Sequence, residues 1–260
     1  MQLGVNIDHI AVLREARKIN DPDPLQAVGI VARAGANQIT IHLREDRRHI
    51  HDEDAKNIIL NSPLPVNLEC SVNPDIIEIV AELKPYRATI VPENREEVTT
   101  EGGLNLNEPN FANIDRSVHF LKAHEIETSL FVDPTKEAIR AAKGIGVEWV
   151  EFHTGHFANI YAMLFSNLRN THHSIKELEL EKRTLLKMLQ KSLLEIREAT
   201  EEAGEFGIKV AAGHGLNYQN VKEIVSIEGI EELNIGQSII ARSVFTGLDQ
   251  ATREMVDLIK

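Results

Sequence analysis

The sequence predicts a (β/α)8 barrel, the TIM-barrel fold, as a single domain over residues 1–260. Two observations lead to this fold class. Eight short segments show the polar and apolar alternation of half-buried strands, and the segments between them have helical apolar spacing. Alternating strands and helices within about 250 residues are typical of this barrel. No Pro/Gly/Ser-rich linker divides the sequence, so one core is expected.

The expected strands recur along the whole chain. They cover residues 4–8, 38–44, 66–69, 88–91, 128–133, 150–153, 208–212 and 232–235. Helices are expected to begin at Asp23-Pro24, Asn73-Pro74 and Asp133-Pro134, because each pair joins a capping side chain to a proline suited to the first turn. Gly35 and Gly207 are expected just after helix ends.

The second expected strand ends in a cluster of imidazole and guanidinium groups. Alternate residues of a strand share a face, so Ile39, Ile41 and Leu43 form an apolar face for packing against helices. The opposite face is polar and free for chemistry; it carries Gln38, Thr40, His42 and Arg44. In such barrels the active site lies at the carboxyl ends of the strands.

Polar residues stand at the ends of other expected strands too. They are Asn6, Asp8 and His9 at the first strand, Glu69 at the third, Glu151 and His153 at the sixth, and His214 at the seventh. Several imidazoles and carboxylates at one barrel mouth favour proton-transfer chemistry.

Charge and composition exclude several classes of protein. The formal charge of −12 argues against non-specific nucleic-acid binding, which depends on Lys and Arg. No apolar run approaches the roughly 18 residues of a membrane span, so we expect a cytoplasmic protein that is not inserted in a membrane. Cys70 is the single cysteine, so no internal disulfide forms.

Anion-binding features surround the expected barrel mouth. Gly213 and Gly215 follow the seventh strand and Gly236 follows the eighth, where barrels assemble a phosphate site from backbone N–H groups. A second anionic group is expected at a basic pocket formed by Arg14, Arg17, Arg44, Arg47 and Arg48. The long connection over residues 93–110 has no helical periodicity and is expected to act as a lid.

These motifs also resemble a known family. The sequence is similar to the pyridoxine 5′-phosphate synthase family along nearly its whole length and in order. The matching segments are residues 4–11 (GVNIDHIA), 41–50 (IHLREDRRHI), 67–69 (NLE), 91–93 (VPE), 98–103 (VTTEGG), 153–155 (HTG), 212–216 (AGHGL) and 233–236 (LNIG).

The resemblance implies a condensation of 1-deoxy-D-xylulose 5-phosphate with 3-amino-2-oxopropyl phosphate, which gives pyridoxine 5′-phosphate, phosphate and water. It also implies a homo-octamer of (β/α)8 barrels, no metal and no organic cofactor. By motif, His42 and Glu69 are implied proton acceptors and His214 a proton donor. The residues implied to contact the deoxyxylulose phosphate are Asp8, His9, Arg44, His49 and Thr99. Those implied to hold the amino-ketone phosphate are Asn6, Arg17, Gly215, Gly236 and Gln237.

The sequence departs from the family pattern in two places. Gln237 stands where the last phosphate motif more often has His, which affects only a side-chain contact. An extra helical segment is expected at roughly residues 167–190, between strands six and seven. The helical pattern over residues 176–203 places leucines on one broad apolar stripe, which predicts a subunit interface nearby. The stripe comprises Leu178, Leu180, Leu185, Leu186, Leu189, Leu193, Leu194 and Ile196.

Other functions are compatible with some of these residues. A metal-dependent sugar-phosphate aldolase or epimerase would use His42, Glu69, His153 and His214 as ligands. A Schiff-base aldolase would need a lysine at a strand carboxyl end, but Lys209 lies near the start of its strand and Lys84 precedes one. A catalytically inactive phosphate-binding or scaffold protein is the alternative outside enzymes.

Overall fold

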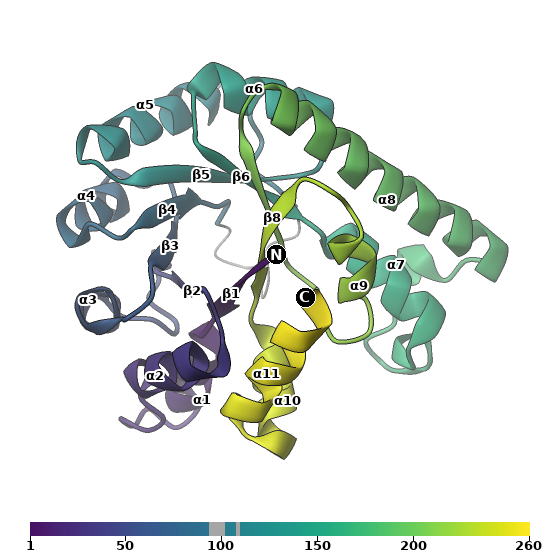
Figure 1. Ribbon diagram of the computed structural model, residues 1–260, viewed down its shortest axis with the longest axis horizontal. Helices are drawn as coiled ribbons and strands as arrows, with labels where there is room; N and C mark the ends of the chain where they lie inside the picture. Colours follow the sequence, from purple (N-terminus) through teal and green to yellow (C-terminus); the bar gives the residue numbers. More distant parts are fainter. Residues whose placement is uncertain (94–101, 108–109) are drawn as a thin grey trace.

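The computed structural model describes residues 1–93, 102–107 and 110–260. Within these ranges parallel strands β1 to β8 close into a barrel in the order of the sequence, which confirms the predicted fold class (Figure 1). The strands are β1 (Gln2–Asn6), β2 (Gln38–His42), β3 (Val66–Cys70), β4 (Arg87–Ile90), β5 (Glu127–Val132), β6 (Trp149–His153), β7 (Lys209–Gly213) and β8 (Ile230–Ile235).

Helices surround the barrel and connect successive strands (Figure 1). They are α1 (Asp8–Glu15) and α2 (Pro24–Ala34) after β1, α3 (Asp52–Asn61), α4 (Pro74–Leu83), α5 (Asn110–Ala123), α6 (Lys136–Ile145), α7 (Gly155–Phe165) and α8 (Lys182–Glu205) before β7, α9 (Val221–Val225) before β8, and α10 (Gln237–Thr246) and α11 (Leu248–Ile259) at the end. No helix in the described ranges combines the length and apolar character that crossing a membrane requires.

Capping side chains begin two of the helices where the sequence predicts them. The Asp23 carboxylate accepts a hydrogen bond from the Leu25 N–H at 2.9 Å, and Asn73 caps α4 in the same way. Gly35 ends α2 with a φ of 105°, a left-handed conformation that glycine adopts without strain.

Several predicted boundaries are wrong, and two of them bear on the site. The first strand ends at Asn6, because the Asn6 side chain accepts a hydrogen bond from the Asp8 N–H and turns the chain into α1. The helix after β5 begins at Lys136, because Thr135 rather than Asp133 provides the cap, accepting from the Ala138 N–H. Asp8 and Asp133 are therefore loop or helix-start residues whose carboxylates are available to the barrel mouth.

The outer face of the strands is apolar and fully buried against the helices, as the alternation in β2 predicts. The inside of the barrel is polar and hydrogen-bonded. Gln38 and Arg87 both donate to Glu232 at 2.9 Å, and the Arg87 guanidinium stacks 3.8 Å from the centroid of Trp149. These contacts satisfy the charges at the amino end of the barrel, so the free polar groups lie at the carboxyl end.

The connection between β6 and β7 contains more than one helix. Two short 3-10 turns, η1 (Leu168–Asn170) and η2 (Lys176–Leu178), precede α8, which is 24 residues long and extends beyond the barrel next to α7 (Figure 1). The predicted stripe is divided between two environments. Leu178, Leu185, Leu189 and Ile196 are buried in the barrel's own core, whereas Leu180, Leu186 and Leu194 are exposed.

Candidate active site

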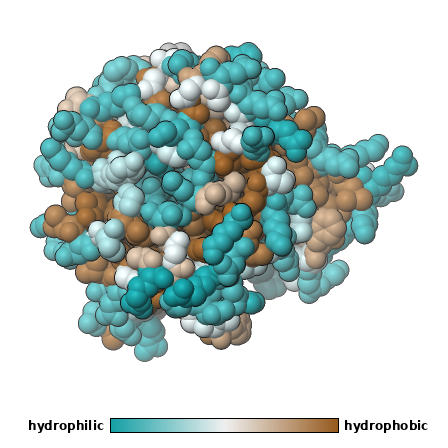
Figure 2. Space-filling view, viewed as in Figure 1, coloured by the Kyte–Doolittle hydropathy of each residue, from teal (hydrophilic) through white to brown (hydrophobic). Residues whose placement is uncertain are grey.

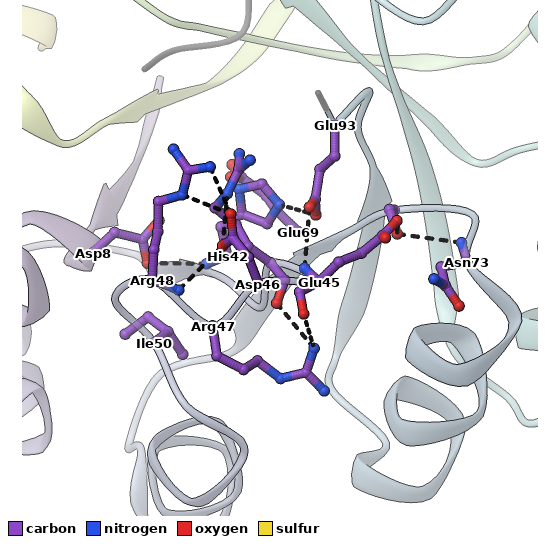
Figure 3. A network of polar contacts seen from close by, with 12 residues as sticks. Asp8, His42, Glu45, Asp46, Arg47, Arg48, Ile50, Glu69, Asn73 and Glu93 are labelled. Atoms are coloured by element: carbon purple, nitrogen blue, oxygen red, sulfur yellow. Dashed lines mark hydrogen bonds and ion pairs between the residues drawn. The ribbon is translucent and has the colours of Figure 1, made fainter. Parts of the chain in front are cut away.

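Strand register brings His42 and Glu69 together at the carboxyl end of the barrel. Residue 42 of β2 pairs with residue 69 of β3. His42 Nδ1 lies 3.9 Å from Glu69 Oε2, and His42 Nε2 lies 2.8 Å from Glu93 Oε1. Figure 3 shows the imidazole of His42 next to both carboxylates. The ring is therefore hydrogen-bonded to Glu93 and lies near the Glu69 carboxyl, an arrangement suited to proton transfer.

Glu93 is a site residue to which the sequence analysis gives no role. Its second oxygen accepts a hydrogen bond from the Glu45 N–H at 3.1 Å. Burial would raise the pKa of Glu93, but its hydrogen bonds to His42 and Glu45 outweigh burial and lower that pKa. Glu93 is thus ionised and holds the His42 ring in place by this hydrogen bond. Its position just after β4, matching that of the other strand-end carboxylates, is the sequence signal that would have identified it.

Glu69 and Glu151 are the carboxylates that face the barrel axis. Burial raises the pKa of Glu69 well above its usual value, and the charge of Glu151 raises it further. Burial, together with the charge of Glu232, raises the pKa of Glu151 to about 8, although the hydrogen bond from Asn234 opposes the shift. Both carboxyls therefore bind a proton at higher pH than an exposed glutamate, as general acids and bases in enzymes often do.

Asp8 forms hydrogen bonds to residues at the ends of β1 and β2. Its carboxylate accepts hydrogen bonds from the His42 N–H at 3.0 Å and from the Asn6 side chain at 3.1 Å. The next residue, His9, lines the cavity, and burial lowers its pKa although the charge of Asp8 opposes this. Asp8 thus fixes the ends of β1 and β2 relative to each other.

His214 is presented by a strained loop after β7. Its φ is 72°, a left-handed conformation that costs a non-glycine residue on the order of 1–2 kcal/mol. The Thr154 hydroxyl oxygen, 2.7 Å from the Gly213 carbonyl oxygen and 2.8 Å from that of His214, holds this backbone in place. Burial, together with the nearby His153, lowers the pKa of His214 to about 4. The ring is therefore neutral at pH 7.

The two glycine loops lie on one side of the same cavity. Gly215 has a φ of 85° and packs so closely on α7 that a Cβ there would lie 2.6 Å from the Cβ of Ala158. Gly236 precedes α10, whose first residue is Gln237, and a Cβ there would lie 2.8 Å from the Cβ of Asn6. Backbone N–H groups at these two positions can approach an anion closely.

A cavity of about 310 Å³ at the barrel mouth joins most of the predicted residues. The predicted residues that line it are Asn6, His9, His42, Glu69, His214, Gly215, Gly236 and Gln237, and Val91, Phe131, Glu151 and Asn234 line it as well. Asp8, Arg17, Arg44 and His49 do not line it. Arg17 is exposed on the turn after α1, whereas Arg44 is buried and its Nε lies 3.5 Å from Asp46. Thr99 lies outside the described residues.

The five arginines of the predicted pocket do not all gather at one place. Arg14 is buried in a bidentate pair with Asp54 of α3, with both distances 2.7 Å, and so joins α1 to α3. Arg47 pairs with Asp52, and Figure 3 shows its side chain pointing away from Glu93. Arg48 pairs with Asp46 at 2.6 Å. Arg14, Arg47 and Arg48 are thus paired with carboxylates, although the sequence pattern groups them into one basic pocket.

Part of the predicted lid can be placed. Residues 102–107 run beside the end of β5, where the Gly103 N–H donates to Asp133 Oδ1 at 3.0 Å and the Leu104 N–H donates to the Phe131 carbonyl at 2.8 Å. The rest of the predicted lid, residues 94–101 and 108–109, lies outside the described residues. In the described ranges, no three His, Cys, Asp or Glu side chains converge in an arrangement that would hold a metal ion.

Comparisons with known proteins agree with this geometry. A solved structure of phosphoribosyl anthranilate isomerase from Thermotoga maritima is similar with a TM-score of 0.57 and 10% identity, covering 100% of this chain and 98% of that one, which reflects the shared barrel fold. The pyridoxine 5′-phosphate synthase of Aliarcobacter butzleri is 66% identical over 100% of this chain and 99% of its own length. That of Sulfurovum sp. is 61% identical over 100% of both chains.

A protein-family profile covers almost all of the sequence. The family described as pyridoxal phosphate biosynthesis protein PdxJ matches residues 3–260. This match spans every strand and every residue that lines the cavity. The chain therefore belongs to the PdxJ family of pyridoxal phosphate biosynthesis proteins and is an enzyme of vitamin B6 biosynthesis.

Proposed function

We propose that the chain condenses 1-deoxy-D-xylulose 5-phosphate with 3-amino-2-oxopropyl phosphate to give pyridoxine 5′-phosphate, phosphate and water. The relatives named pyridoxine 5′-phosphate synthase support this activity. One structural observation carries the proposal. A single cavity joins two axial carboxyls and several imidazoles to two glycine loops suited to an anion. Ring closure between two phosphate esters needs several proton transfers and anion binding at one place.

His42 and Glu69 are the proposed proton acceptors. A raised pKa makes Glu69 a stronger base than an exposed glutamate once it is ionised, which favours removal of a proton from carbon or nitrogen. His42 is the second proposed acceptor, and Glu93 Oε1, 2.8 Å from its Nε2, holds the ring at the cavity.

His214 is the proposed proton donor for departure of water. His214 lines the same cavity as Glu69 and directly precedes Gly215. The neutral ring must gain a proton before it can donate one as an imidazolium. The route by which His214 is reprotonated is thus part of the mechanism.

The two phosphate esters are assigned to opposite sides of the mouth. The amino-ketone phosphate is proposed at Asn6, Arg17, Gly215, Gly236 and Gln237, supported by the close backbone approach at the two glycines. The deoxyxylulose phosphate is proposed at Asp8, His9, Arg44, His49 and Thr99. Arg44 and His49 follow β2 on the side of the cavity away from β7.

The remaining features of the proposal concern the whole protein. We propose one catalytic domain over residues 1–260, acting as a cytoplasmic homo-oligomer, most simply the octamer implied by the family resemblance. Its partners are two small phosphorylated substrates, without nucleic acid or membrane. Proton transfer by side chains supplies the chemistry, with no metal and no organic cofactor assigned.

Incubation of the purified protein with both substrates tests the activity. We expect a pyridine absorbance to appear together with inorganic phosphate, and only when both substrates are present. Omission of either substrate is the control for chemistry on one substrate alone. A protein that binds both phosphate esters but forms no pyridine would instead be a binding protein, and the proposed activity would be rejected.

A further inference from the structure

A second cavity, of about 680 Å³, adjoins the catalytic one at His214. It lies between the ends of β5 and β6, the start of α7 and the middle of α8. Asp133 and His153 line it and are 3.3 Å apart, from Oδ1 to Nδ1. Neither residue belongs to the proposed proton acceptors, proton donor or phosphate contacts.

The contact with Asp133 defines the protonation pattern of His153. The hydrogen bond from His153 lowers the pKa of Asp133, so the carboxylate is ionised and can only accept. Nδ1 of His153 must therefore carry the hydrogen. In the neutral ring, Nε2 then has a free lone pair.

This lone pair is buried and has no partner among the described residues. The His153 side chain is 7% exposed, and its Nε2 has no hydrogen-bond partner within the described ranges. Buried polar atoms are nearly always hydrogen-bonded, so a persistent exception in a cleft indicates a functional role.

The lone pair is close to His214. The centroids of the two imidazole rings are 4.8 Å apart. The centroid of the Phe131 ring lies 5.3 Å from that of His153 and 6.4 Å from that of His214. The missing side chain of Gly155 leaves the space between them, because a Cβ there would lie 2.6 Å from His153 Nε2 and 3.0 Å from His214 Cδ2.

We propose that Asp133 and His153 form a dyad that orients His214 and returns a proton to it after each donation. The inference rests on the proposed function, since it assumes that His214 donates a proton. His153 acts through His214 and is therefore a positioning residue rather than a catalytic one.

The proposed step balances in protons. His153 accepts at Nε2 a proton that enters by way of the larger cavity, and its ring becomes an imidazolium beside Asp133. The proton then passes to the neutral His214 ring, which becomes the imidazolium that donates it to the substrate. After each donation both rings are neutral again. The titratable groups that line the two cavities around these rings are Asp133, His153, His156 and Glu195 on the α8 side and His9, His42, Glu69 and Glu151 on the axial side.

Kinetics of His153→Gln test the dyad. Glutamine retains much of the volume and a hydrogen bond to Asp133 but cannot carry a proton. We expect kcat to fall by about 10²-fold with little change in KM, because only the proton return is lost. His156→Gln is the matched control, the same change at an exposed ring of the same cavity, and should retain activity. Equal losses in both variants, or normal kcat in His153→Gln, would overturn the dyad.

Chemical rescue separates proton return from packing. His153→Ala removes the ring beside a cavity that is large enough for imidazole. We expect added imidazole to restore at least part of the lost kcat in a saturable, pH-dependent manner, and to leave His153→Gln unaffected. Lack of rescue in a folded His153→Ala protein that binds substrate normally would reject proton transfer through this position.

A measurement without turnover distinguishes this inference from the proposed function. The pKa of His214, followed by NMR of its ring, should rise in His153→Gln, because the nearby imidazole lowers it in the wild type. An unchanged His214 pKa would contradict electrostatic contact between the two rings. If the wild-type protein formed no pyridine at all, the activity would fail, whereas this coupling of the two histidines would still be measurable.

Discussion

Glu151 occupies the space that a side chain at position 213 would fill. A Cβ on Gly213 would collide with Glu151 Oε1 and would lie 3.0 Å from the Asn234 carbonyl oxygen. Glycine at position 213 thus lets a carboxyl from β6 lie under the loop that carries His214. Asn234 donates to the other Glu151 oxygen at 2.7 Å, so this carboxyl is enclosed by β7 and β8.

The enclosure of Glu151 predicts a pH dependence of stability. Its pKa rises from 4.5 to about 8 on folding, so the folded protein binds its proton more tightly than the unfolded chain does. This contribution is fully present below pH 4.5 and is lost as the pH rises towards 8. Glu151→Gln should therefore make the free energy of unfolding less dependent on pH between about 4.5 and 8, by an amount on the order of a few kcal/mol. If the prediction is wrong, urea titrations across this range would give the same pH dependence of the free energy of unfolding for the wild type and for Glu151→Gln.

Glu69→Gln should separate chemistry from binding. Glutamine keeps the shape of the side chain but cannot accept a proton, so turnover should fall by roughly 10²–10⁴ while the affinity for both phosphate esters remains. Steady-state kinetics and binding titrations measure the two effects. Turnover close to that of the wild type would remove Glu69 from the mechanism.

The glycine loops should govern affinity rather than the chemical step. Gly215→Val introduces a side chain where φ is 85° and the Ala158 Cβ is already close, and Gly236→Val would press on Asn6. Both variants should bind phosphate esters more weakly, whereas His214→Asn should mainly lower kcat. If both glycine variants bound phosphate esters with intact affinity and unfolded at the same urea concentration as the wild type, the phosphate site would have to lie elsewhere.

The projecting end of α7 and α8 should contribute to assembly. Phe165 is 51% exposed, and Leu180 and Leu186 nearby are also exposed. Figure 2 shows an apolar area over this part of the surface. We expect light scattering to report a homo-oligomer and Phe165→Glu with Leu186→Glu to weaken it. A monomer of 29.1 kDa would reject assembly, and an oligomer unaffected by these changes would reject this surface as the interface. Lys191→Glu, on an exposed residue of the same helix, is the charge control.

The sequence predicts the barrel and the axial residues well, because both follow from local periodicity. Strand alternation alone places His42 and Glu69 on the inner face, and the parallel register then pairs them. The carboxylate partners of the cations cannot be predicted in this way. Arg14 belongs to α1, but its partner Asp54 comes from α3, 40 residues away in sequence. Only the folded chain shows that this arginine is structural.

The partners of Glu93 and Asp133 could not be predicted from the sequence for a related reason. Each follows a strand, but its role depends on where the next loop directs the carboxylate. The Glu93 carboxylate is hydrogen-bonded to His42 of β2, and the Asp133 carboxylate is hydrogen-bonded to His153 of β6. Periodicity describes strands and helices, whereas loop conformation depends on contacts between distant segments.

Turnover by metal-depleted protein tests the central claim most directly, namely that side-chain acids and bases carry the reaction. Protein dialysed against a chelator, and shown by elemental analysis to contain no stoichiometric metal, should form the pyridine product at the rate of untreated protein. If the activity disappeared and a divalent cation restored it, the imidazoles and carboxylates would be metal ligands. That result would contradict the roles proposed for His42, Glu69 and His214.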